Sequence, residues 1–377
     1  MRYGRPLWAA YYDSVVSANK VGATISLARK KLLGGEVLIR PGWVTREIAV
    51  SVFAALIGLD VVAWATLPQE LAARHMRSII RISPDRKRVY TASAAEPALA
   101  AAAAQLLHRD NDAYLDEFLS RLIEVCIDGL VLEGVRGEMV ARIVLILAMH
   151  QLTKDTNYIK PVSMRDFLSV LFEDGVVEAL ERNCCSLDVE LFFNCFLPTN
   201  LPPTSKKLDE YFERCAAMVN RRNERVVDLC LPGKDSTSGS NPTRINPPRA
   251  AKKARSSMDY PIQMCLPGQV KNRKNDGCVP GAAEMLDADE RFINQRASVL
   301  FQIGSPKSTV DVSGTVLLVH GLDFALHFLN EGVVTRLKQL ASTHVDVFNG
   351  ASELERALVE RMVPLAYRHA ADNNEEA

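Results

Sequence analysis

The chain has 377 residues, 48% of them hydrophobic, and its 45 Lys and Arg residues balance 45 Asp and Glu residues. This is an ordinary globular composition, and the length allows two or three domains with a sizeable core. A net charge of zero excludes a general attraction to polyanions, so any contact with nucleic acid must come from local basic patches.

No segment has the pattern of a secretory signal or of a membrane span. The longest apolar run, Met139 to Met149, is interrupted by Arg142 and is shorter than the roughly 20 residues that a membrane helix needs. The eight cysteines form no CxxC pair, which is typical of reduced, mostly buried thiols. We therefore expect an intracellular protein without membrane contact.

The first 180 residues are predicted to be mainly helical. Apolar residues at helical spacing, together with cap signals, indicate helices over 13–33, 45–58, 97–108, 112–132, 138–152 and 163–173. A hairpin is predicted over 76–93, with its turn at Pro84-Asp85. Three histidines, scattered singly, are interpreted as structural: His75, His108 and His150. Three tryptophans lie in apolar contexts and are predicted to be core residues: Trp8, Trp43 and Trp64.

From about residue 185 the pattern changes to short strands and fewer helices. Helices are predicted over 206–215, 329–342 and 352–362, and strands over 217–221, 226–231, 262–271, 298–303 and 315–320. The stretch 233–257 is rich in Ser, Pro, Gly and basic residues and is predicted to be a disordered insertion. The predicted fold class is α+β, with a helical region over 1–180, a small α/β domain over 185–350, and a C-terminal helix and tail over 351–377.

An acid and a short QxK sequence are the most informative feature of the second half. Asp228 ends one short apolar run, and Gln269-Val270-Lys271 closes a later one. A carboxylate on one strand, with an oxygen donor two residues before a lysine on the next, can hold a hard cation and orient a water beside it. This pattern indicates hydrolysis of a phosphodiester.

Several segments carry a resemblance to a known group of proteins. They are GRPLW from Gly4, SLARKKLLGG from Ser26, ARHMRSIIRISPDRKRVYTASAAEP from Ala73, RGEMVARIVLILA from Arg136, RCAAMVNRRNERVVDLCLP from Arg214 and QVKN from Gln269. In order and spacing they resemble Crinkler-type effectors and retrotransposon hot-spot proteins of eukaryotic microbes. Those proteins join a P-loop NTPase to a restriction-endonuclease-like domain of the PD-(D/E)xK type. This chain has no GxxxxGK[ST] phosphate cradle, so we expect neither bound nucleotide nor ATP hydrolysis, and interpret it as a truncated form.

The resemblance implies a magnesium site built from a helix acid, a strand aspartate and an (E/Q)xK strand. It places the strand aspartate at Asp228, the oxygen donor at Gln269 and the lysine at Lys271. Glu210, on the preceding helix, is the best candidate for the helix acid. Asp228, Gln269 and Glu210 would hold Mg²⁺, and Lys271 would position the attacking water. Two other acids of the same helix are alternatives: Asp209 and Glu213.

Two features depart from the family pattern. Gln269 stands where glutamate is usual, which removes a negative charge and lowers the expected affinity for a hard cation. Pro267-Gly268 immediately precedes it, and proline fits poorly in a central strand because it lacks a ladder donor.

Basic residues near these strands are candidate contacts for nucleic-acid phosphates: Arg221, Arg222, Lys252, Lys253 and Arg255. The run from Lys252 to Arg255 also has the composition of a nuclear-import signal, with a solvated linker as the alternative. His320 and Asp323 could form a hydrolase or metal pair, but no GxSxG motif accompanies them, so a core or strand-end position is favoured.

The first hypothesis is therefore a Mg²⁺-dependent endonuclease acting on DNA. The alternative is a non-catalytic interaction protein, in which the helical half binds a protein partner and the nuclease fold is degenerate. A product without stable function is the third interpretation.

Overall fold

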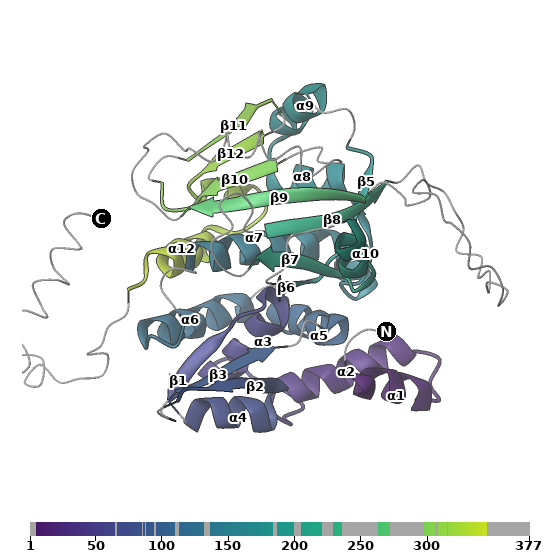
Figure 1. Cartoon of the computed structure of the whole chain (residues 1–377), viewed down its shortest axis with the longest axis vertical. Helices are drawn as coiled ribbons and strands as arrows, with labels where there is room; N and C mark the ends of the chain where they lie inside the picture. The colour runs from purple at the N-terminus through teal and green to yellow at the C-terminus, as the bar shows by residue number, and fades with distance from the viewer. Residues whose placement is uncertain are drawn as a thin grey trace, which may run out of the picture.

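The computed structural model describes residues 5–344, except 65, 85, 87, 94–95, 110–112, 132–135, 184–186, 200–204, 221–228, 236–262, 272–297, 306–307 and 315. The α+β class is confirmed, since helices dominate the first half and a large mixed sheet occupies the second (Figure 1). The predicted helix over 352–362 and the C-terminal tail lie outside the described residues.

Nine helices occupy the first half of the described chain. They are α1 (Pro6–Ser14), α2 (Lys20–Leu32), α3 (Arg46–Ile57), α4 (Thr66–Arg74), α5 (Pro97–Leu107), α6 (Ala113–Ile127), α7 (Arg136–Thr153), α8 (Met164–Leu171) and α9 (Asp174–Asn183), with the 3-10 turn η2 (Lys154–Thr156) after α7. The later helices are α10 (Ser205–Glu213), the 3-10 turn η4 (Asp323–His327) and α12 (Glu331–Ser342).

The strands form two sheets. A small sheet contains β1 (Val61–Trp64), β2 (Arg77–Ile82) and β3 (Arg88–Ser93). The large sheet contains β4 (Val162–Ser163), β5 (Val189–Leu191), β6 (Cys195–Thr199), β7 (Ala216–Asn220), β8 (Leu229–Asp235), β9 (Gln263–Lys271), β10 (Ser298–Gln302), β11 (Thr309–Ser313) and β12 (Val316–His320).

Cap residues set the ends of several helices as the sequence predicts. The Thr45 hydroxyl accepts a hydrogen bond from the Ile48 amide at the start of α3, and Gly58 ends that helix with φ +64°. A side chain would be strained at this φ, which glycine adopts freely. The helix predicted over 13–33 is wrong at its start, because α2 begins only at Lys20, after the cap Asn19.

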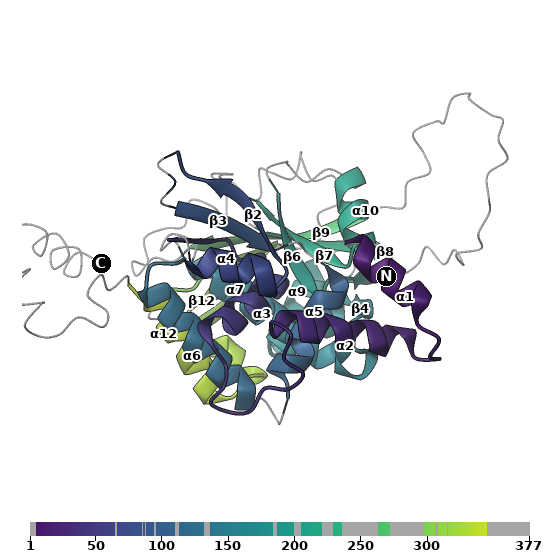
Figure 2. The ribbon, with the colours of Figure 1, turned by 90° about the horizontal axis from the view of Figure 1, so that it is seen from below.

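The small sheet contains the predicted hairpin. Strands β2 and β3 pair antiparallel, and β1 pairs with the other side of β3. The hairpin projects beyond the helices when the molecule is seen from below (Figure 2). Strand β1 was not predicted, because a four-residue strand has too few positions to show a period. Helix α4 was not predicted either.

The large sheet has the strand order β11-β12-β10-β9-β8-β5-β4, and β7 also pairs with β8 and β6. Strand β9 is antiparallel to β8 and parallel to β10, which is in turn parallel to β12. The predicted insertion over 233–257 is wrong at its first residues, because residues 233–235 belong to β8 and pair with β5. Its remainder lies outside the described residues.

The apolar core is continuous across the predicted boundary at residues 180–185. One cluster of buried side chains extends from Trp8 to Leu340 and includes every position of α7 from Met139 to Met149 except Arg142. Helix α12 lies against α6 and α7, where Arg336 Nε contacts Asp116 Oδ1 at 3.0 Å. The helices and the large sheet therefore stabilise each other through shared burial of apolar surface.

Some single-residue predictions are confirmed and others are wrong. Trp8 is buried and donates from Nε1 to Glu96 Oε2 at 2.7 Å, whereas the side chain of Trp43 is 63% exposed. The side chain of Trp64 lies outside the described residues. His108 Nε2 lies 2.9 Å from His150 Nδ1, so these two histidines form a pair and are not scattered.

Burial dominates the chemistry of the described thiols. Cys126, Cys195 and Cys215 are free and buried, as predicted, and burial raises the pKa of Cys126 to about 11. Cys230 is disulfide-bonded, which contradicts the prediction that all eight thiols are reduced.

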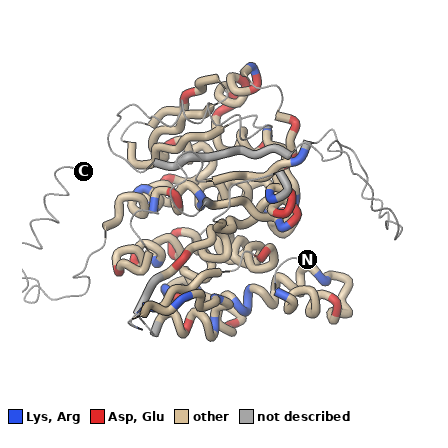
Figure 3. The backbone as a smooth tube through the Cα atoms, viewed as in Figure 1, with Lys and Arg blue, Asp and Glu red and all other residues tan. Residues whose placement is uncertain are grey.

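In the part of the chain that the structure describes, no helix combines the length and the apolar character needed to cross a bilayer. Acidic and basic residues are interspersed along its backbone (Figure 3).

Candidate functional site

The strands that carry the predicted QxK sequence and the predicted acid are neighbours. Strand β8 begins at Leu229, and this residue pairs with Gly268 of β9. Gln269 follows Gly268 directly, and Asp228 precedes Leu229 in the sequence. Asp228 itself lies outside the described residues, as do the side chains of β9. The backbone therefore brings the first residue of β8 and the QxK end of β9 to one edge of the sheet.

The QxK sequence lies at the carboxyl end of a run of parallel strands. Gln269 pairs with Leu300 of β10, and Lys271 pairs with Gln302, the last residue of that strand. Gln302 pairs in turn with His320, the last residue of β12. Three strands thus end at the same level, and this edge of the sheet is where the predicted chemistry would occur.

The position of Pro267 explains how a proline is accommodated in β9. Pairing between β9 and β10 begins at Gly268, one residue after the proline, while Pro267 pairs with Cys230 of β8 on the other side. Strand β9 therefore has described neighbours on both sides only from Gly268 onward. A missing ladder donor is tolerated where a strand is paired on one side.

The predicted helix acid is at the other end of these strands. Asp209 Oδ1 lies 3.8 Å from Lys234 Nζ, and Phe212 places its ring 4.7 Å from the same ammonium group. Lys234 pairs with Gln263, at the start of β9, and is five residues beyond Leu229, or roughly 16 Å along an extended strand.

Figure 1 shows α10 beside that end of the sheet, opposite the arrowhead of β9. Glu210 follows Asp209 on this helix and is exposed. Partial burial raises the pKa of Asp209 although Lys234 opposes the shift, which agrees with a long and weak ion pair. The resemblance to the nuclease family was the ground for selecting Glu210. The strand register and the contact of Asp209 with Lys234 show that its helix lies at the opposite end of the strands from the QxK sequence.

The predicted nucleic-acid contacts lie outside the described residues: Arg221, Arg222, Lys252, Lys253 and Arg255. Among the residues that the structure does describe, no group of three or more His, Cys, Asp or Glu side chains could hold a metal ion.

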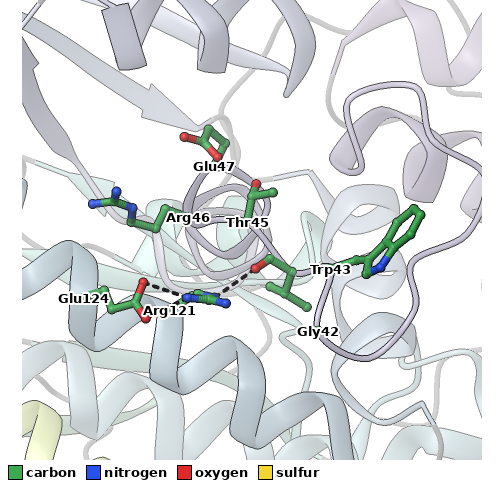
Figure 4. Close-up of a pocket in the computed structure, with 8 residues that line it drawn as sticks. Gly42, Trp43, Thr45, Arg46, Glu47, Arg121 and Glu124 are labelled. Carbon is green, nitrogen blue, oxygen red and sulfur yellow. Dashed lines mark hydrogen bonds and ion pairs between the residues drawn. The ribbon is translucent and has the colours of Figure 1, made fainter.

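A separate cavity of about 390 Å³ lies at the N-terminus of α3 (Figure 4). Arg121 donates from Nε to the Val44 carbonyl at 3.0 Å and contacts Glu124 at 2.8 Å. The amides of Gly42 and Val44 donate to the carboxylate of Glu117. These polar groups satisfy one another, so the arrangement fixes the loop rather than presenting free donors to a ligand.

A comparison with protein families matches residues 44–245 to a family described as a domain of unknown function, DUF8736. The match covers more than half of the 377 residues. The chain belongs to the DUF8736 family. The DUF8736 segment begins one residue before the Thr45 cap of α3 and continues beyond the end of β8, so it includes the helical core and the first strands of the large sheet. Strands β9, β10 and β12, which carry the QxK edge, follow the DUF8736 segment in the sequence.

No curated protein and no solved structure matches the chain.

Proposed function

We propose that the chain is a Mg²⁺-dependent phosphodiesterase acting on DNA, with its site at the edge where β8 begins and β9 ends. The observation that carries this proposal is the pairing of Leu229 with Gly268. Leu229 follows Asp228 in the sequence and Gly268 precedes Gln269, so this pairing supports a site built from Asp228, Gln269 and Lys271. Support also comes from the resemblance to restriction-endonuclease-like proteins in the same residues.

The donor set has the chemistry that magnesium requires. Asp228 would supply a carboxylate oxygen and Gln269 an amide oxygen, and Mg²⁺ usually takes one or two protein carboxylates and keeps several waters. When bound, the ion would neutralise charge on the phosphoryl group and favour ionisation of a nearby water. Two protein donors suffice for this mode of binding, so the proposal does not depend on Glu210.

Lys271 would act on the water and the phosphate directly. Its ammonium group carries three donors, which can orient the attacking water and offset the negative charge that develops on the phosphate. Loss of such a preorganised donor commonly lowers turnover by about a hundredfold or more.

The test is nicking of a supercoiled plasmid by the full chain, with and without Mg²⁺. Asp228→Ala and Lys271→Ala should both abolish cleavage, whereas Lys234→Ala, at the other end of β8, should retain it. Cleavage that survives both of the first two changes would remove these residues from the proposed site.

A second candidate function is favoured by one observation. The loop between α2 and α3 exposes three large apolar side chains: Val37 at 64%, Leu38 at 61% and Trp43 at 63%. Aromatic residues of this kind frequently anchor protein partners. If the chain is an interaction protein, Trp43→Ser should abolish co-purification of a protein partner without altering the thermal unfolding temperature, and unchanged co-purification would count against it.

A further inference from the structure

His320 ends β12 at the level of the proposed site. Its Cα pairs with Gln302 of β10, and Gln302 pairs with Lys271 of β9. Neighbouring strands lie about 4.8 Å apart, so roughly 10 Å separates His320 from the chain position of Lys271. Paired positions of adjacent strands lie on the same face of a sheet. Lys271, Gln302 and His320 therefore occupy one row across three parallel strand ends.

Backbone hydrogen bonds hold this row in place. The Gln302 carbonyl accepts from the amide of Gly321 at 3.0 Å and from that of Ser305 at 3.2 Å. Gly321 adopts φ +71°, so the chain turns sharply just after His320. On the opposite face, Phe301 lies against Phe324 with ring centroids 6.1 Å apart. The ends of β10 and β12 are thus fixed to each other beside His320.

The ring of His320 has a polar atom that the described residues do not satisfy. Nδ1 is buried and has no hydrogen-bond partner among them, although the residue as a whole is only partly buried. A buried N–H without an acceptor is costly, so in the neutral ring the proton is favoured on Nε2. That nitrogen then acts as a donor at the level of Lys271.

The acids near His320 are engaged elsewhere. Asp323 is ion-paired with Lys338 of α12. Beyond His320 the row continues to Thr309 of the edge strand β11, whose hydroxyl contacts Asp311 Oδ2 at 3.3 Å. That carboxylate would repel a phosphate, so a phosphate contact along this row would end at His320.

We propose that His320 binds a phosphate of the substrate strand that flanks the phosphate being cleaved. One strand of B-form DNA carries a phosphate about every 3.4 Å along its axis, so a row of roughly 10 Å spans more than one of them. Hydrogen bonds from such side chains to phosphate oxygens fix the register of a nucleic acid without reading its sequence. The inference rests on the proposed phosphodiesterase function and adds a residue that holds the DNA strand beside the phosphate being cleaved.

The test compares two substrates of different length in the full chain. Bis(p-nitrophenyl) phosphate has a single phosphate and cannot occupy a flanking position, whereas a DNA duplex can. We expect His320→Ala to raise KM for the duplex about tenfold, the effect of one hydrogen bond to a charged group. Its hydrolysis of the small substrate should stay unchanged. His327, an exposed residue of η4, provides the matched control: His327→Ala should leave the hydrolysis of both substrates unaffected.

Two conservative variants separate phosphate binding from a structural role. Gln reaches the position of Nε2 and Asn that of Nδ1, so His320→Gln should restore duplex binding while His320→Asn should not. The proposal is overturned if His320→Asn restores duplex binding and His320→Gln does not. It is also overturned if a His320 variant loses as much activity on the small substrate as on the duplex.

Affinity for a fluorescein-labelled duplex, measured with Ca²⁺ in place of Mg²⁺, separates this inference from the proposed function. One outcome is that the wild type cleaves neither substrate, while His320→Ala still weakens duplex binding about tenfold. In that case the proposed function fails and the phosphate contact stands. The proposed phosphate contact is overturned if the wild type and His320→Ala bind the duplex with equal affinity, or if neither binds it.

Discussion

We expect the buried ring of His150 to make stability depend on pH near neutrality. His150 is fully buried on α7, and its Nδ1 lies 2.9 Å from Nε2 of His108. Burial, reinforced by the neighbouring His108, lowers the pKa of His150 well below its ordinary value of 6.5. His75 is also buried, and burial lowers its pKa in the same direction.

A lowered histidine pKa means that the unfolded chain binds protons more readily than the folded chain. The contribution to stability is therefore complete above pH 6.5 and falls as the pH drops below that value, because protons then favour unfolding. Each such histidine reduces the free energy of unfolding by about 1.4 kcal/mol per pH unit while its folded ring stays neutral. For His150 alone, about 1.4 kcal/mol should be lost between pH 7.5 and pH 5.5.

The assay is urea unfolding at a series of pH values, with the slope of stability against pH as the measured quantity. His150→Gln should reduce this slope by about 1.4 kcal/mol per pH unit below pH 6.5, whatever its effect on stability at neutral pH. His327→Gln makes the same substitution at an exposed position and is the control. If the wild type and His150→Gln have the same slope, the burial argument is refuted.

Two further predictions concern the buried residue Glu96 and the helix-ending residue Gly58. Glu96 is fully buried and accepts from Trp8 Nε1 at 2.7 Å, with Arg5 Nε at 3.2 Å. Glu96→Ala should therefore cost about 3 kcal/mol in urea unfolding, and Glu96→Gln clearly less; equal costs would argue against a specific role for the carboxylate. At Gly58, φ is +64° and an added Cβ would lie 2.7 Å from Pro198 Cδ, so Gly58→Ala should cost about 1–3 kcal/mol. An unchanged unfolding temperature would contradict that expectation.

Local signals explain why the helices were predicted better than the strands. Helix α3 has the Thr45 cap at its start and Gly58 at its end, and helix α8 has the Ser163 cap. These signals involve residues that are close together in the sequence. Strands β4 to β6 have two to five residues each. Their partners are distant in the sequence, and so few positions show no clear alternation.

The candidate site could be predicted only in part. The spacing of Gln269 and Lys271 suggested a strand end, and β9 does end at Lys271. The pairing of Lys271 with Gln302, and of Gln302 with His320, depends on strand order, which no local pattern encodes. The same limitation explains the selection of Glu210, because sequence proximity to β7 does not reveal at which end of the sheet α10 lies.

Exposure and pairing of single side chains were the least predictable features. Trp43 was predicted to be a core residue, yet its side chain is exposed and the guanidinium group of Arg40 lies over its ring. His108 and His150 are forty-two residues apart and meet only because α5 and α7 share one core. Such contacts are set by tertiary packing and leave no periodic signal.

The central claim is that Gln269 is an oxygen donor to Mg²⁺, and the magnesium dependence of plasmid nicking tests it most directly. Adding a carboxylate to a hard-cation site raises its affinity, so Gln269→Glu should lower the half-maximal Mg²⁺ concentration by about tenfold, on the order of 1.4 kcal/mol. Gln263→Glu, at the opposite end of β9, should leave the concentration unchanged. If both variants behave alike, or if neither they nor the wild type nick the plasmid, the proposed site is contradicted.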